Sequence, residues 1–205
     1  MWGASLNIKR IDNYKDKRFS EAVLKQHGAF VVDDNLYEVE IISDMEAVVR
    51  GPEKYQKDVI EEFRFFAEHI SKFYNEQGET IAEYASVELF DVPISLIQPS
   101  QFFVDQEKKS ALSSFINEAS DIVIPLNKKE ERYVSLDGHT RLSIAVDKGY
   151  DVIKRFLTEN AEWVEVFVNE AQKRGIFSPY DIKEVNHEEY DIKWNKFCDE
   201  LFDKE

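Results

Sequence analysis

The residues best suited to chemistry lie in one short segment, Asp137 to Arg141, which reads Asp-Gly-His-Thr-Arg. An alternating stretch at 132–136 predicts a β-strand before it, and apolar residues at helical spacing over 142–146 predict a helix after it. A glycine at such a junction lets the backbone approach a ligand closely, and a helix start attracts anions. Arg141 can hold two phosphate oxygens, and His139 can donate a hydrogen bond or move a proton. The predicted ligand contacts are the last four residues of the segment, Gly138, His139, Thr140 and Arg141.

The same segment also allows a purely structural interpretation. Asp137 can cap the helix, and Gly138 can permit a tight turn. His139 and Arg141 would then be solvated residues of the first helical turn. Both interpretations stay open on the local pattern alone, because short motifs also match by chance.

A family resemblance favours the phosphate interpretation. Residues 136–142 resemble the Gly-x-x-Arg signature of the ParB/sulfiredoxin superfamily, and residues 92–101 resemble its entry strand and Pro-containing loop. A predicted helix at 107–117 and a short apolar strand at 122–126 follow in the expected order. The resemblance covers residues 90–170. It implies an α+β fold with a small mixed β-sheet, in which the signature loop lines a cleft.

Within this superfamily the resemblance is closest to the free-serine kinases, which hold nucleotide and substrate phosphate with an Asp-Gly-His-x-Arg segment. That likeness implies catalytic roles for Asp137 and His139. The catalytic carboxylate of those kinases falls on Gln101 here, and an amide cannot act as a general base. Sulfiredoxin places its reactive cysteine between the glycine and the arginine, where this chain has His139 and Thr140. Sulfiredoxin activity is therefore not expected.

Three functions remain as hypotheses. We favour a protein that binds a nucleotide or a phosphorylated metabolite, with the phosphate held by residues 137–141. The resemblance then implies ATP, ADP or CTP as ligand, accompanied by Mg²⁺ through its phosphate oxygens. The alternatives are a small-molecule kinase acting on a free amino acid, and a non-catalytic interaction or structural protein. No cluster of residues requires a metal, and the sequence leaves the oligomeric state open.

Composition narrows the classes of partner. The chain has 205 residues, a net charge of −15 and 43% hydrophobic residues, which predicts a globular acidic protein. The negative charge disfavours nucleic acid, and residues 171–205 are too few for the helix-turn-helix domain of the partitioning proteins. No apolar run is long enough for a membrane span and no secretory signal is visible. The single cysteine, Cys198, suits a reducing compartment, so we predict a cytoplasmic protein.

We predict three parts along the chain: an N-terminal α+β region at 1–90 packed on the core, the superfamily-like domain at 91–170, and a helical extension at 171–205. Residues 78–91 are the predicted boundary segment. The predicted elements outside the superfamily-like domain are a short helix at 16–26, a hairpin of 29–32 with 36–42, a strand at 47–50, a long helix at 53–77, and helices at 159–173 and 187–202. We interpret the stripe of the long helix as core packing, and its members are Val59, Phe63, Phe66, Ile70 and Phe73.

Overall fold

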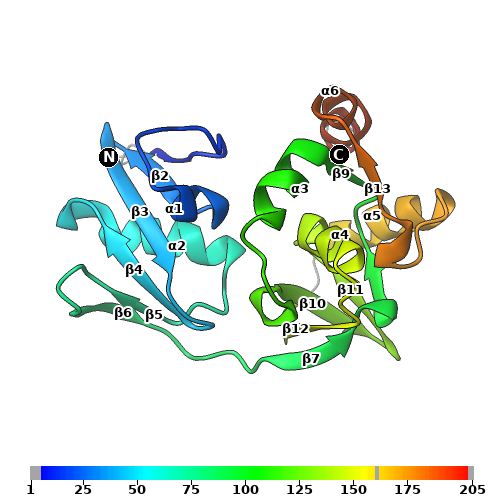
Figure 1. Ribbon diagram of the computed structural model, residues 1–205, viewed down its shortest axis with the longest axis horizontal. Coiled ribbons are helices and arrows are strands. Elements are labelled where there is room, and N and C mark those ends of the chain that lie inside the picture. Colours follow the sequence, from blue (N-terminus) through cyan, green and yellow to red (C-terminus); the bar gives the residue numbers. More distant parts are fainter. Residues whose placement is uncertain (1–5, 160–161, 203–205) are drawn as a thin grey trace. The chain divides into compact units, whose positions relative to one another are not determined.

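The structure is a computed structural model that describes residues 6–159 and 162–202. It has an α+β fold built from mixed sheets and helices (Figure 1). The chain divides after Val87 into two compact units, which we call unit 1 and unit 2. The division falls inside the predicted boundary segment 78–91. Residues beyond 170 belong to unit 2 together with the preceding ones.

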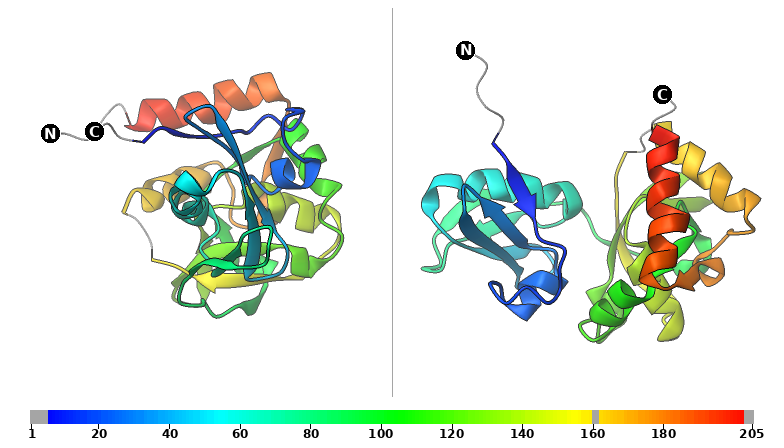
Figure 2. Two further views of the ribbon diagram at one scale, coloured as in Figure 1. Left: turned by 90° about the vertical axis from the view of Figure 1, so that its left-hand side faces the viewer. Right: turned by 90° about the horizontal axis from the view of Figure 1, so that it is seen from above.

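Unit 1 contains a six-stranded sheet with the strand order β1-β2-β3-β4-β5-β6. Its strands are β1 (Ile8–Arg10), β2 (Ala29–Val32), β3 (Asn35–Ile41), β4 (Glu46–Arg50), β5 (Lys72–Tyr74) and β6 (Thr80–Glu83). Neighbouring strands are antiparallel except β4 and β5. A parallel pair needs a crossover, and α2 (Gln56–Phe66) provides it (Figure 2). A short helix, α1 (Glu21–Lys25), precedes β2.

The predicted hairpin forms between β2 and β3. Its turn residues Asp33 and Asp34 both have positive φ angles, 47° and 62°. Two successive positive φ angles are typical of the type I′ turn, whose twist matches that of the flanking strands. The local turn chemistry therefore explains why this prediction is correct.

The predicted long helix at 53–77 is wrong in its length. A 3₁₀ turn at Glu53–Tyr55 precedes α2, which ends at Phe66, and β5 follows from Lys72. The apolar spacing continues past the end of the helix because Ile70 and Phe73 reach the same core from a turn and a strand. Gly78, the residue that follows the predicted helix, lies between β5 and β6 with φ 81°.

The interpretation of the apolar stripe as core is confirmed for four of its five members. Val59, Phe63, Ile70 and Phe73 are at most 2% exposed and pack in one cluster with strand residues such as Phe30. The side chain of Phe66 lies outside the described residues.

Unit 2 contains a five-stranded mixed sheet with the order β7-β12-β10-β11-β8. Its strands are β7 (Phe90–Pro93), β8 (Ile97–Pro99), β10 (Val123–Lys129), β11 (Arg132–Ser135) and β12 (Val152–Leu157). The pairs β10–β12 and β8–β11 are parallel, and the other two pairs are antiparallel. Two further strands, β9 (Phe103–Asp105) and β13 (Lys183–Val185), pair in parallel outside this sheet.

Helices cover both faces of the unit 2 sheet. The main helices are α3 (Gln106–Ser113), α4 (His139–Asp147) and α5 (Glu162–Lys173). The larger core joins α3 and α4 to the sheet through residues such as Leu112, Leu142 and Ile124. On the other face, Val164 and Val168 of α5 contact Val134 of β11. The sheet therefore lies between two helical layers, and α4 belongs to one of them.

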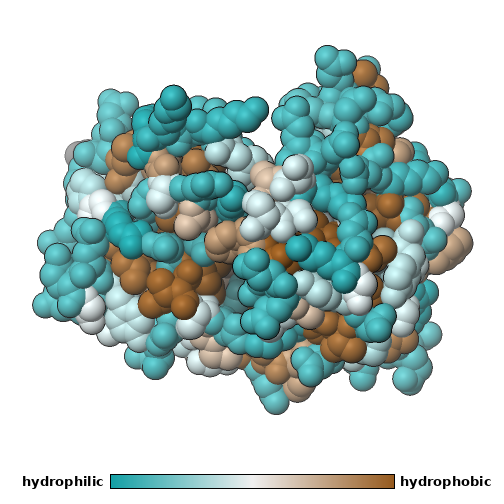
Figure 3. Space-filling view, in the orientation of Figure 1, coloured by the Kyte–Doolittle hydropathy of each residue, from teal (hydrophilic) through white to brown (hydrophobic). Residues whose placement is uncertain are grey.

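The end of unit 2 is helical. A four-residue α6 (His187–Tyr190) continues through a π turn at Asp191–Asn195 into α7 (Lys196–Phe202), and the three form one rod in both views of Figure 2. Trp194 and Phe197 of this rod pack against Phe102 with ring centroids 5.0 and 5.2 Å away. On the face shown in Figure 3, hydrophilic side chains cover most of the surface and apolar ones form scattered patches.

Candidate functional site

The segment 137–141 connects β11 to α4, as the sequence predicts. Gly138 has φ 80°, in the left-handed region that favours glycine. A Cβ atom at this position would collide with Ile124 Cδ1 and would lie 3.4 Å from Nη2 of Arg141. The glycine is therefore required twice, by its backbone conformation and by the close approach of β10 and the arginine.

The start of α4 lacks a side-chain cap. Gly138 is the N-cap residue and makes no side-chain hydrogen bond to the helix. Asp137 hydrogen-bonds to the N–H of Gly138 and not to a helical N–H, so it does not act as an ordinary cap. Gly138, His139 and Thr140 are all buried. Buried first-turn N–H groups normally need a partner, and a ligand can supply it.

Arg141 lies beside this loop with its guanidinium oriented by the protein. Nη1 donates to the carbonyl of Val123 at 2.8 Å, and Nη2 lies 3.7 Å from Oδ2 of Asp137. The second distance is longer than a hydrogen bond. The carboxyl of Asp137 is 59% exposed at its side chain. Partial burial opposes ionisation, but the charge of Arg141 and the Gly138 N–H outweigh it and lower the pKa of Asp137.

His139 is held by hydrogen bonds within the protein. Its Nε2 accepts hydrogen bonds from the backbone N–H groups of Ser100 and Gln101, both at 3.2 Å, and from the hydroxyl of Ser135 at 2.9 Å. The imidazole is 5% exposed, and burial lowers its pKa to about 4. The ring is therefore neutral and its acceptor nitrogen is occupied. These hydrogen bonds connect the loop after β8 to the start of α4, and the catalytic role of His139 stays a prediction.

Gln101 lies in the loop that faces α4. Its backbone contacts His139, while its side-chain Nε2 donates to the carbonyl of Phe103 and, at 3.1 Å, to the hydroxyl of Tyr190. The loop at 99–103 and the segment 137–141 thus lie against each other. Gln101 offers no proton acceptor of useful basicity, so the arrangement provides no general base at this position.

Several residues that the sequence analysis did not select also belong to this region. Lys108, on the first turn of α3, acts electrostatically on both Asp137 and His139. Tyr190 reaches Gln101 from α6. Ser135 is completely buried below the loop. Lys108 and Tyr190 are brought to the loop by tertiary packing, so no local pattern marks them, whereas Ser135 lies two positions before the loop in the sequence.

Three other basic residues that are close to Arg141 in the sequence, Lys128, Lys129 and Arg132, have other positions in the fold. Arg141 contacts Val123, the first residue of β10, whereas Lys128 and Lys129 are the last two residues of that strand. The two ends of β10 are roughly 15–20 Å apart. Lys129 pairs with Glu165 at 2.7 Å, and Arg132 donates to the carbonyl of Phe177. Their closeness to Arg141 in the sequence therefore does not place them at the loop, whereas Lys108 acts electrostatically on Asp137 and His139.

The described residues include neither a cluster suited to a metal ion nor a helix suited to a membrane span. Within residues 6–159 and 162–202, no group of three or more His, Cys, Asp or Glu side chains is arranged to hold a metal ion. Over the same described ranges, no helix has the length and apolar character needed to cross a bilayer.

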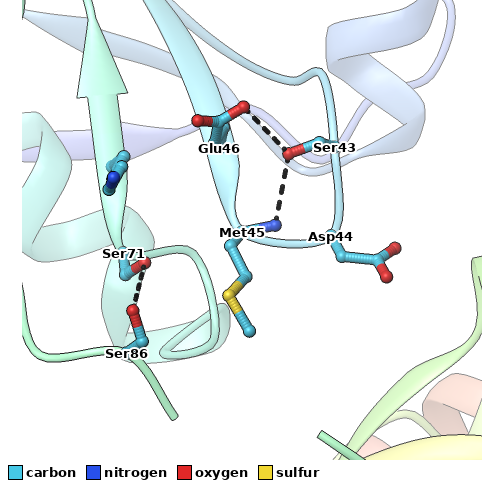
Figure 4. Close-up of a pocket in the computed structure, with 7 residues that line it drawn as sticks. Ser43, Asp44, Met45, Glu46, Ser71 and Ser86 are labelled. Carbon is cyan, nitrogen blue, oxygen red and sulfur yellow. Dashed lines mark hydrogen bonds between the residues drawn. The ribbon is translucent and has the colours of Figure 1, made fainter. Parts of the chain in front are cut away.

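A separate pocket lies in unit 1. It has a volume of about 560 Å³ and lies between the β3–β4 turn, the start of β5 and Ser86 (Figure 4). Figure 4 shows the side chain of Met45 near the hydroxyls of Ser71 and Ser86, which are 3.4 Å apart. The lining residues are Ser43, Asp44, Met45, Glu46, Ser71, Lys72 and Ser86. None of them belongs to the predicted phosphate site.

Comparisons with known proteins leave the family open. No family model matches the chain, and no curated protein matches it. Among solved structures, the crystal structure of protein Atu1540 from Agrobacterium tumefaciens is similar over 47% of this chain, with 12% sequence identity and a TM-score of 0.36. The similarity covers 62% of that chain, which is less than two thirds of its length. A likeness of this size carries no functional argument.

Proposed function

We propose that this protein binds a phosphorylated small molecule, a nucleotide or a phosphometabolite, through the loop Asp137–Arg141. The observation that supports this function best is the buried, uncapped start of α4 at Gly138. Backbone N–H groups and the positive end of the helix dipole favour a phosphate at such a position. The ParB/sulfiredoxin resemblance of the same residues points to the same ligand class.

The charges around the loop support an anionic ligand. Arg141 and Lys108 both act electrostatically on Asp137 of this loop, so two cationic side chains influence the position where a phosphate would bind. The 3.7 Å separation of Asp137 and Arg141 leaves the guanidinium able to form shorter, charge-assisted bonds with phosphate. The bond to Val123 keeps the guanidinium in place, so little side-chain entropy is lost on binding.

The geometry favours binding over phosphoryl transfer. His139 is neutral with its acceptor nitrogen occupied, and Gln101 stands as an amide where the kinases have their catalytic carboxylate. A kinase would need another base in reach of the acceptor hydroxyl. Any Mg²⁺ would arrive with the phosphates of a nucleotide.

Thermal-shift measurement with ATP, ADP, CTP, GTP and inorganic phosphate, each with Mg²⁺, tests the proposal. A ligand at about 100 times its dissociation constant stabilises the folded protein by about 2.7 kcal/mol. We expect a shift with at least one of these ligands, and calorimetry then gives its affinity. Arg141→Gln and Lys108→Gln are each expected to weaken binding about tenfold, since each removes a charged donor.

Lys148→Gln is the matched control, because Lys148 is an exposed cation at the opposite end of α4. It removes the same charge while leaving the loop intact. Equal affinities in all three variants would contradict a phosphate site at the loop. The absence of any shift with the five ligands would instead favour the structural interpretation of the Asp-Gly-His-Thr-Arg segment.

A further inference from the structure

The C-terminal helical segment brings one hydroxyl group to the candidate site. Tyr190, the last residue of α6, lies with its Oη 3.1 Å from Nε2 of Gln101. The residue is partly buried, and α6 lies next to β9, the strand that follows the Gln101 loop. Tyr190 and Gln101 are 89 positions apart in the sequence, so this contact is made only by the fold.

The hydrogen-bond directions leave the proton of Tyr190 uncommitted. The amide nitrogen of Gln101 also donates to the carbonyl of Phe103, which fixes the orientation of the amide group. An amide NH₂ only donates, so Oη of Tyr190 is the acceptor in the shared bond. Within the part of the chain that the structure describes, no hydrogen bond from the Tyr190 hydroxyl to a protein acceptor is formed. The hydroxyl is a free donor.

Electrostatics keep this donor protonated. Burial, with further contributions from Asp105 and Asp137, raises the pKa of Tyr190 to about 12. The geometric link to the loop is Gln101, whose side chain contacts Tyr190 and whose backbone N–H donates to His139.

Two contacts hold α6 in the position that this requires. His187, one turn before Tyr190, bonds through Nδ1 to Oδ2 of Asp105 at 2.6 Å. Asp105 is 6% exposed, and its Oδ1 accepts from the N–H of Glu107 at the start of α3. The aromatic contacts of Trp194 with Phe102 hold the rest of the rod. The turn that carries Tyr190 is thus linked directly to the helix that carries Lys108.

We propose that Tyr190 donates a hydrogen bond to an oxygen of the phosphorylated ligand, so that the C-terminal helical segment forms part of the binding site. The His187–Asp105 pair acts as a positioning pair for Tyr190. This inference rests on the proposed function, since it adds a residue to the same phosphate site.

Replacement of the hydroxyl tests the inference. Titration with ATP–Mg²⁺ and with inorganic phosphate is performed on the wild type, on Tyr190→Phe and on Tyr180→Phe. We expect Tyr190→Phe to weaken binding about tenfold, because a donor to a charged acceptor is lost. Tyr180→Phe removes a hydroxyl from an exposed tyrosine of the same unit and should leave affinity unchanged.

The outcomes separate the two proposals. If the wild type binds and Tyr190→Phe binds equally well, Tyr190 is not part of the site and the phosphate loop stands alone. If the wild type binds neither ATP–Mg²⁺ nor phosphate, and the other nucleotides also fail, the proposed function itself is overturned. Circular dichroism of each variant confirms that the fold is retained.

The positioning pair has its own test in the pH dependence of binding. The groups that face His187 are Asp105 and Glu107 from the β9–α3 junction and Asp191 from its own helix, and Asp105 is the main cause of its raised pKa. His187→Gln removes the titrating group. Dividing the dissociation constant of the variant by that of the wild type at each pH cancels the ionisation of the ligand.

We expect this ratio to be several-fold at low pH and to fall toward one as the pH rises through the raised pKa of His187, where the wild-type imidazole loses its proton. A merely structural role for His187 would give a ratio that does not change with pH. That result would remove His187–Asp105 from the inference while the hydroxyl test still decides Tyr190.

Discussion

The two units bury different kinds of side chain. Among the described residues, unit 1 buries two polar side chains, His69 and Ser71, within an otherwise apolar core. Unit 2 buries many more, and most of them adjoin the loop before α4 or the elements that face it. They are Gln98, Ser100, Asp105, Lys109, Ser135, His139, Thr140, Ser143 and Arg155.

The two units therefore differ in the kind of interaction that stabilises their interiors. Burying polar groups is unfavourable unless each finds a partner, and a sheet-and-helix core does not need them. In unit 1 the aromatic rings of Phe30, Phe63 and Phe73 pack edge to face and supply stability. In unit 2 the hydrogen bonds around His139 fix one loop in one conformation. A unit that holds a loop so firmly is the better candidate for ligand binding.

The largest effect is expected from a core substitution in unit 1. Phe63→Ala removes a ring that is 2% exposed and contacts Phe30 and Phe73. Its cavity should lower the stability of unit 1 by about 3–5 kcal/mol. Native-state hydrogen exchange of the α2 and β3 amides measures this loss. Phosphate affinity should not change, and a change in affinity would contradict the separation of roles between the units.

The pH dependence of unit 2 should be the next largest effect. Burial lowers the pKa of His139 to about 4 in the folded state, below the ordinary value of about 6.5 for histidine, so the unfolded state binds the proton first as the pH falls. Its contribution to stability is complete above pH 6.5 and is lost as the pH falls toward 4. The loss is about 1.4 kcal/mol per pH unit, or roughly 3 kcal/mol in all.

Urea denaturation of unit 2 between pH 7 and pH 4.5 checks this expectation, with His139→Gln as the variant that cannot titrate. The pH slope should be much smaller in the variant. NMR titration distinguishes His139 from His187, whose pKa is shifted in the opposite direction by Asp105. A His139 resonance that titrates near pH 6.5 would contradict the buried, neutral imidazole.

The sequence was sufficient where a feature depends on neighbouring residues. The β2–β3 hairpin follows from the turn at Asp33–Asp34, and the junction at Gly138 follows from a strand, a glycine and a helix in succession. The prediction of a helix up to residue 77 was wrong at β5, because Phe73 continues the apolar spacing of α2 although that helix has already ended at Phe66. Periodicity reports which residues face a core and not which element presents them.

The site was predicted only in part for a similar reason. The loop itself is local, and its glycine and arginine lie together as predicted. The role of His139 depends on Ser100 and Gln101, 39 and 38 positions away, and Tyr190 is more distant still. Such hydrogen bonds decide whether a histidine is free to react, and no spacing rule in one sequence reveals them.

A smaller effect is expected from comparing two glycines at the ends of α4. Gly138 and Gly149 both have positive φ, 80° and 68°, but a Cβ atom would meet Ile124 at the first and nothing within 4 Å at the second. Gly149→Ala should cost about 1–2 kcal/mol from backbone strain alone. Gly138→Ala should cost about 1 kcal/mol more, because Ile124 must move.

Denaturation of the two variants measures the difference between them, and ligand titration adds a second readout. Only Gly138→Ala should weaken phosphate binding, since only its methyl group would lie beside the Arg141 guanidinium. Equal stability losses would show that the close approach at Gly138 is relaxed in solution. Equal affinities would show that the space next to Arg141 is not used by the ligand.

The smallest effect is expected from Lys129→Gln. This variant tests whether a lysine that is close to the loop at 137–141 in the sequence, but distant from it along β10, contributes to binding. The ion pair of Lys129 with Glu165 is solvent-exposed on both sides, so its loss should change stability by less than about 0.5 kcal/mol. Its distance from the loop along β10 should leave phosphate affinity unchanged at physiological salt, where exposed charges more than about 8 Å apart are largely screened. Titration of the variant with phosphate at low salt and at physiological salt measures the affinity with and without long-range electrostatic effects. A loss as large as that of Lys108→Gln at physiological salt would mean that the ligand extends along β10 toward Lys129. The binding site would then be larger than the loop at 137–141.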